Sequence, residues 1–136
     1  MTHYGAVSAI DGVLEAEVAP TVLGYGGGSE RVTFLVDTGA TGEMTLPHGI
    51  IARLNLPLVT YGSANASVVL ADGTVSVARV HTARVLWHDQ VRTAEVVSFG
   101  SDPLIGMGLL RGSNLSVDAI PGGLVTITEL PTLSRA

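Results

Sequence analysis

Short runs of apolar, often β-branched residues alternate along this 136-residue chain with turns that contain glycine. This alternation constrains the fold more than any other feature. Apolar runs of about four to eight residues between turn signals are typical of β-strands, whereas helices need longer amphipathic segments. Several short strands with regular turns indicate a small barrel or a sandwich. We therefore predict an all-β fold and one domain that covers residues 1–136.

The turn signals place the individual elements. Residues 13–23 and 31–36 are predicted strands on either side of a glycine loop, and together they form a hairpin. The pair Asp72-Gly73 predicts a tight turn between strands at residues 66–70 and 75–80, because Asp-Gly favours such turns. The other predicted elements are a hairpin of residues 83–87 and 91–98, closing strands at residues 115–117 and 124–128, and short helices at residues 46–54 and 105–110.

Composition excludes several classes of function. Hydrophobic residues make up 46% of the chain and charged residues 14%, so the chain is not intrinsically disordered. With so few charges available for the surface, we expect some apolar surface to lie in a subunit interface. The seven basic residues are scattered and the net charge is −5, which argues against nucleic-acid binding. The lack of cysteine excludes disulfides and thiolate chemistry.

The sequence also gives no sign of a membrane segment or a metal. No apolar run approaches the length of about 18 residues that a membrane helix needs. The first residues lack the basic and apolar regions of a signal peptide, so a cytoplasmic location is the default expectation. The four histidines (His3, His48, His81 and His88) do not have the spacing of metal ligands, and we expect no metal and no cofactor.

The clearest chemical signal is the motif Asp37-Thr38-Gly39, which follows the apolar residues 34–36. A strand that ends in this way places one carboxylate in a tight turn, close to backbone N–H groups. The threonine hydroxyl can hydrogen-bond to a neighbouring strand and hold the turn in place. This layout suits a positioned acid or base. The alternative is a turn aspartate that only caps local N–H groups.

A single aspartate is a poor general base, because the ordinary pKa of this side chain is about 4. Two neighbouring carboxylates that share one proton titrate separately and provide one acid and one base. No second Asp-Thr/Ser-Gly motif occurs in the chain; Asp72-Gly73-Thr74 comes nearest, with a different order and in a predicted hairpin turn. Either Asp37 acts alone, or its partner is Asp37 of a second copy across a two-fold axis.

The order of these motifs resembles that of the retropepsin-like aspartic proteases, particularly the small single-domain prokaryotic members. The resemblance runs from about residue 13 to residue 127. The segments that carry it are the apolar run with Asp37-Thr38-Gly39-Ala40, a flap-like hairpin at residues 68–73, and residues 102–110, in which Leu104, Ile105 and Gly106 match the second family signature.

The resemblance implies a small closed barrel with one short C-terminal helix, active as a symmetric homodimer. It also implies an aspartic endopeptidase that binds peptide or protein substrates in an extended conformation. An Asp dyad, with one Asp37 from each protomer, would activate a water molecule, and no cofactor or metal would take part. The implied site residues are the catalytic Asp37, the catalytic-loop residues Thr38, Gly39 and Ala40, the flap residues Leu70, Ala71, Asp72, Gly73 and Thr74, and the structural residues Leu104, Ile105 and Gly106.

Two departures from the viral members concern the way the dimer is braced and the tip of the flap. In those enzymes an acidic residue after the catalytic motif and an arginine after the second signature form an ion pair that braces the dimer. Thr41-Gly42 and Met107-Gly108 occupy these places here. The predicted flap tip has Asp-Gly instead of a glycine-rich sequence, and it could be an ordinary solvated turn. The alternative function is a catalytically silent retropepsin-fold module that dimerises or binds extended peptides.

Overall fold

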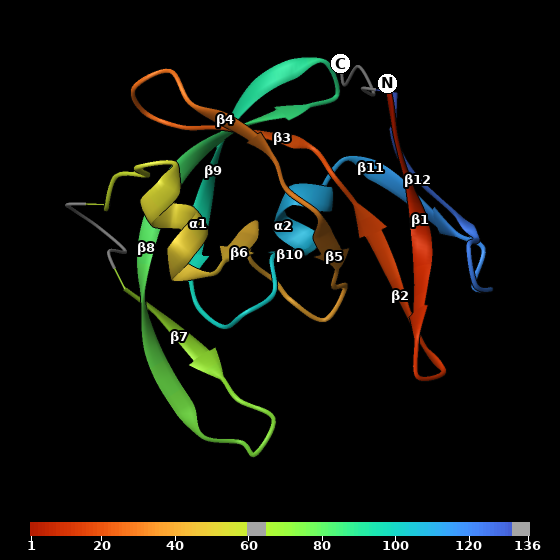
Figure 1. Cartoon of the computed structure of the whole chain (residues 1–136), viewed down its shortest axis with the longest axis horizontal. Coiled ribbons are helices and arrows are strands. Elements are labelled where there is room, and N and C mark those ends of the chain that lie inside the picture. Colours follow the sequence, from red (N-terminus) through yellow and green to blue (C-terminus); the bar gives the residue numbers. More distant parts are fainter. Residues whose placement is uncertain (60–64, 132–136) are drawn as a thin grey trace, which may run out of the picture.

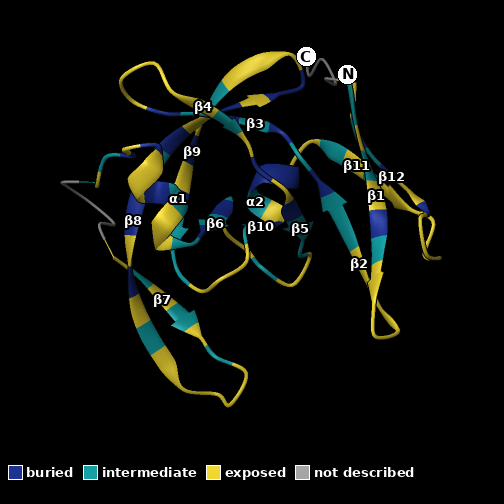
Figure 2. Cartoon of the chain, in the orientation of Figure 1, coloured by how far each residue is buried: buried dark blue, intermediate teal, exposed yellow. Residues whose placement is uncertain are grey.

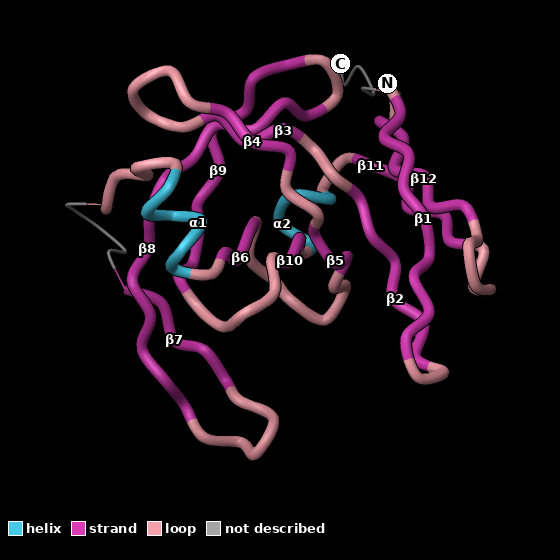
Figure 3. Tube along the Cα trace, in the orientation of Figure 1, coloured by secondary structure: helices cyan, strands magenta, loops and turns pink. Residues whose placement is uncertain are grey.

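A computed structural model of the chain describes residues 1–59 and 65–131. Strands make up most of this part of the chain, and the helices are short (Figures 1 and 3). The prediction of an all-β fold is therefore confirmed. In chain order the elements are β1 (Thr2–Ile10), β2 (Val13–Val18), β3 (Thr21–Leu23), β4 (Ser29–Arg31), β5 (Phe34–Val36), β6 (Met44–Leu46), α1 (His48–Arg53), β7 (Asn65–Val69), β8 (Val75–Trp87), β9 (Gln90–Ser98), β10 (Leu104–Ile105), α2 (Met107–Leu110), β11 (Ser113–Val117) and β12 (Leu124–Glu129).

The predicted hairpins form where turn residues separate the strands. β3 pairs with β4 across the glycine loop, and β7 pairs with β8 across the Asp72-Gly73 turn. Gly73 has a φ of 84°, a conformation that glycine adopts without strain. At the β8–β9 turn His88 and Asp89 both have positive φ, as a type I′ turn requires. β8 continues without a break to Trp87, so the strands predicted at residues 75–80 and 83–87 are one strand.

β1 is a long strand that the turn pattern did not indicate. It pairs with β2 across Asp11-Gly12 and, on its other edge, with β12. With β11 these strands form a terminal sheet in the order β11-β12-β1-β2, which lies on one side of the molecule in Figure 1. Small residues such as Gly5 and Ala6 interrupt the apolar alternation of β1, and they weaken the sequence signal for a strand.

The hydrogen-bonded sheet does not close, so the prediction of a closed barrel is wrong. Its path through the described residues is β11-β12-β1-β2-β5-β10-β6-β9-β8-β3-β4, with β7 paired to β8. The path would form a ring if β2 and β3 were one strand, as predicted for residues 13–23. Pro20 lies between them; its carbonyl accepts a hydrogen bond from Val32 N at 3.1 Å, but proline has no N–H to donate.

The core lies inside the curl of this sheet, where Figure 2 shows the buried residues. Both helices contribute to it, through Ile51 of α1 and Leu109 of α2. None of the helices in the described ranges is both long and apolar enough to cross a bilayer. The largest fully buried side chains are those of Phe34, Met44, Leu46, Ile105, Leu109, Ile127, Val22, Val85, Val96 and Val125.

Candidate active site

Asp37 follows β5 directly, at the start of a loop that returns to the sheet as β6. Its backbone N–H donates to the carbonyl of Ile105 at 2.9 Å, and its own carbonyl accepts from Ala40 N at 3.1 Å. The side-chain Oδ1 accepts a hydrogen bond from Gly39 N at 3.0 Å. The aspartate is therefore held in a tight turn by its own backbone neighbours, as the motif predicts. Its side chain is half-buried, while Thr38 and Gly39 are exposed.

The second signature packs against this loop. In β10, Leu104 and Ile105 pair in parallel with β5 and antiparallel with β6, so β10 lies between the two strands that flank residues 37–43, the loop that the resemblance predicts to be the catalytic loop. After β10, Met107 N donates to Ala40 O at 2.8 Å and Gly108 N donates to Gly42 O at 3.0 Å. The loop and the second signature therefore form one hydrogen-bonded unit, in which the signature residues have a supporting position.

Asp37 lines a pocket of about 460 Å³ between the catalytic loop and the β7–β8 hairpin, which is the predicted flap hairpin. The hairpin projects from the body of the molecule in Figure 1. Among the described residues that line this pocket, Asp37 is the only titratable one. Lining side chains from β6, β7, β9 and the segment up to β10 are mostly apolar. They include Met44, Val68, Val69, Val97, Phe99 and Leu104.

The flap residues predicted from the resemblance, Leu70 to Thr74, form the turn at the end of the β7–β8 hairpin and are not among the residues that line the pocket. Asp72 accepts hydrogen bonds from the Thr74 hydroxyl at 2.6 Å and from Thr74 N at 2.9 Å, and these bonds lower its pKa. Within one chain this tip is a solvated turn. The hairpin residues that do line the pocket are Ala66 to Val69 of β7. The sequence predicted a strand there and the resemblance included Val68 and Val69 in the flap-like hairpin, but neither named them as site residues.

Residues 27–112 match the model of a family described as "gag-polyprotein putative aspartyl protease", which covers more than half of the chain. The chain belongs to the retropepsin-like aspartyl proteases. A solved structure described as a retropepsin-like aspartic protease from Rickettsia conorii aligns with it at a TM-score of 0.52 and 16% identity, over 95% of this chain and 92% of that chain. At such low identity this likeness supports the fold alone. No curated protein matches the sequence.

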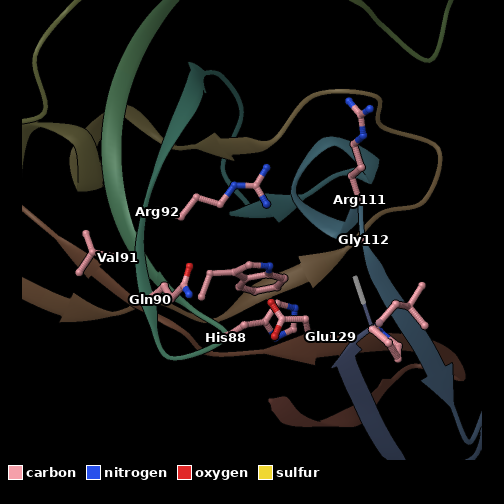
Figure 4. Close-up of a pocket in the computed structure, with 10 residues that line it drawn as sticks. His88, Gln90, Val91, Arg92, Arg111, Gly112 and Glu129 are labelled. Atoms are coloured by element: carbon pink, nitrogen blue, oxygen red, sulfur yellow. The ribbon is translucent and has the colours of Figure 1, made fainter. Parts of the chain in front are cut away.

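A second pocket of this retropepsin-like chain, of about 820 Å³, lies away from Asp37 (Figure 4). It shares no lining residue with the first pocket. Its walls include Trp87, Arg92, Arg111 and Glu129. Within the described ranges no three His, Asp or Glu side chains gather as a metal site requires. The Asp37-Thr38-Gly39 motif thus contributes to the 460 Å³ pocket and not to the 820 Å³ pocket.

Proposed function

We propose that this chain is an aspartic endopeptidase whose active site forms when two copies bring their Asp37 residues together. The observation that carries the proposal is that Asp37 is the only titratable residue among those described around its pocket. One carboxylate alone does not provide both an acid and a base. A two-fold axis beside the catalytic loop supplies the second carboxylate without any further motif in the chain.

In the proposed dimer the two carboxylates share one proton, because two close negative charges repel each other. The ionised one takes a proton from a water molecule, whose oxygen adds to the peptide carbonyl carbon. The protonated one donates its proton to the carbonyl oxygen, which gives a tetrahedral diol. The C–N bond then breaks, the nitrogen leaves with a proton returned from the dyad, and the products are a carboxylic acid and an amine.

We propose that the substrate is an extended peptide with an apolar side chain next to the cleaved bond. The lining of the Asp37 pocket supports this, since apolar residues of β6, β7 and β9 face it. β7 pairs with β8 and has a free edge within the described part of the chain, which offers backbone groups to an added strand. The flap hairpin would then cover the peptide and exclude water from the dyad.

The dyad is tested by mixing wild-type chains with the Asp37→Asn variant and allowing subunits to exchange. The variant alone should cleave no peptide while it still dimerises, as measured by sedimentation. In an equal mixture a site that needs both carboxylates leaves about a quarter of the activity of the same total concentration of wild-type chains, whereas an Asp37 that acts alone in each chain leaves about half. Full activity of the variant would contradict the proposal, and a wild-type chain that dimerises but cleaves no peptide would favour the silent peptide-binding module.

A further inference from the structure

Arg92 of β9 connects three parts of the molecule through its guanidinium group. Nη2 donates to Glu43 Oε2 at 2.8 Å and to Gly108 O at 3.2 Å, and Nη1 donates to Leu109 O at 3.2 Å. Glu43 is at the end of the catalytic loop, directly before β6, while the two carbonyls belong to α2. One side chain therefore binds the loop that carries Asp37 and the helix that follows the second signature.

Glu43 uses both of its carboxylate oxygens in this arrangement. Oε2 accepts from Arg92, and Oε1 accepts from the backbone N–H of Glu95 at 3.0 Å. The carbonyl of Glu43 also accepts from Gly106 N at 3.1 Å. The end of the catalytic loop is thus attached to β9 by its side chain and to the second signature by its backbone.

We propose that Glu43 and Arg92 form a positioning pair that holds the catalytic loop, and with it Asp37, against β10 and α2. This inference rests on the proposed function for its effect on catalysis. The last carbonyls of a helix have no partner within the helix, and an arginine fork can satisfy two of those of the four-residue helix α2 and a carboxylate at once. This pair differs from the ion pair that braces the dimers of the viral members, because the positions of that pair, residues 41–42 and 107–108, carry no charge here.

Geometry, more than charge attraction, explains why an arginine is needed. The side chains of Arg92 and Glu43 are 34% and 25% exposed, so solvent screens their attraction. The three acceptors of Arg92 are the Glu43 carboxylate and two successive carbonyls of α2, and a planar guanidinium reaches them together, while the single ammonium group of lysine does not. We therefore expect Arg92→Lys to keep the charge but to lose most of the positioning.

The second pocket allows the role of Arg92 to be tested with a small molecule that replaces its missing side chain. Arg92 lies on the wall of the 820 Å³ pocket, where Figure 4 shows its side chain extending from β9. In Arg92→Ala the missing atoms correspond to ethylguanidinium, a small cation that can enter from this pocket. Propylammonium carries the same charge without the fork of donors and is the matched control probe.

Arg92→Ala should lower kcat about 10- to 100-fold, because displacement of the loop moves the Asp37 carboxylate away from the reacting bond. KM should change much less, because the apolar lining side chains of β7 and β9 keep their places. Ethylguanidinium should restore part of kcat with saturation, and propylammonium should not. Arg84→Ala, on the exposed face of the neighbouring strand β8, is the control and should leave kcat unchanged. Unchanged kcat in Arg92→Ala, loss that ethylguanidinium does not relieve, or equal relief by propylammonium would overturn the proposal.

A second pair of variants tests whether the two side chains act as one unit. Glu43→Ala should lower kcat about as much as Arg92→Ala, and the double variant should be no worse than either single one. If the fold-loss of kcat in the double variant equalled the product of the two single-variant losses, the two side chains would act independently and the inference of a common unit would be overturned. If Arg92→Ala does not fold, Arg92→Lys and Glu43→Gln replace it. Each should lower kcat, by less than the 10- to 100-fold loss expected for Arg92→Ala.

Hydrogen exchange separates this inference from the proposed function. The amides of Ala40, Gly106 and Met107 form the bonds that fix the loop, and Arg92→Ala should speed their exchange by about tenfold or more, while amides of the terminal sheet keep their rates. This outcome supports the positioning pair even if the wild-type chain cleaves no peptide, which would refute only the proposed protease. Unchanged exchange at these amides would overturn the positioning role.

Discussion

At the scale of single residues, Gly106 shows how closely the two signatures approach each other. A Cβ at this position would lie 2.4 Å from Gly42 O and 2.9 Å from Ala40 O, and both are backbone atoms of the catalytic loop. We expect Gly106→Ala to lower the free energy of unfolding by about 1–3 kcal/mol in urea titrations, because the loop has to move. Gly49→Ala in α1 is the control, since no atom lies near its Cβ and alanine favours a helix. Equal losses in both variants would contradict the explanation.

The residues that could be predicted from the sequence are those that form short motifs. Asp37 and Gly106 lie in local patterns whose turn chemistry is visible in the chain. The Glu43–Arg92 pair was not visible, because its members are 49 positions apart and neither belongs to a motif. Only the folded sheet, with β6 beside β9, brings these side chains together.

At the scale of elements, the two strands of the flap hairpin differ in their relation to the Asp37 pocket, because residues of β7 line it and residues of β8 do not. Val68 of β7 is half-buried and lines the Asp37 pocket, whereas Val77 of β8 is 70% exposed and is not among the lining residues. We expect Val68→Ser to raise KM for an apolar peptide about tenfold, because lost apolar contact with substrate weakens binding. Val77→Ser in the same hairpin should leave KM unchanged. KM is measured for both variants by steady-state kinetics on one peptide series. An equal rise in KM for the two variants would argue against a substrate contact made by Val68.

Hairpins could be predicted because their turns are local, and the turns at Asp72-Gly73 and residues 88–89 form as expected. Elements whose partners lie far away in the sequence were harder to define. β10 has two residues and is stabilised as a strand only by β5 and β6 on its two sides, so its sequence alone indicated the start of a helix. Residues 32–33 likewise divide one predicted strand into β4 and β5, opposite the break at Pro20.

At the scale of the whole molecule, His3 of β1 connects the terminal sheet to the body of the molecule in addition to the pairing of β2 with β5. Its ring stacks on Trp87 with centroids 4.2 Å apart, and its Nε2 accepts a hydrogen bond from His88 N at 2.9 Å. This bond requires an unprotonated Nε2. The ring of His88 in turn hydrogen-bonds to Ser113 of β11 at 2.7 Å. Two histidines therefore connect the N-terminal and C-terminal strands with the β8–β9 hairpin.

Acid should weaken this connection and with it the stability of the whole fold. Burial lowers the pKa of both histidines, and the charge of His88 lowers that of His3 further, while Asp89 and Glu129 oppose these shifts in part. Because the folded pKa values lie below the ordinary value of 6.5, the unfolded chain binds protons first as the pH falls. The histidine contribution is therefore complete above pH 6.5 and is lost progressively below it, through the lowered folded pKa values.

For the wild-type chain, the urea concentration at the midpoint of unfolding should fall as the pH is lowered from about 7.5 to about 5.5. It should fall less for a His3→Gln/His88→Gln variant, while His48→Gln, at an exposed position, should keep the wild-type slope. An unchanged slope in the double variant would show that other groups cause the loss.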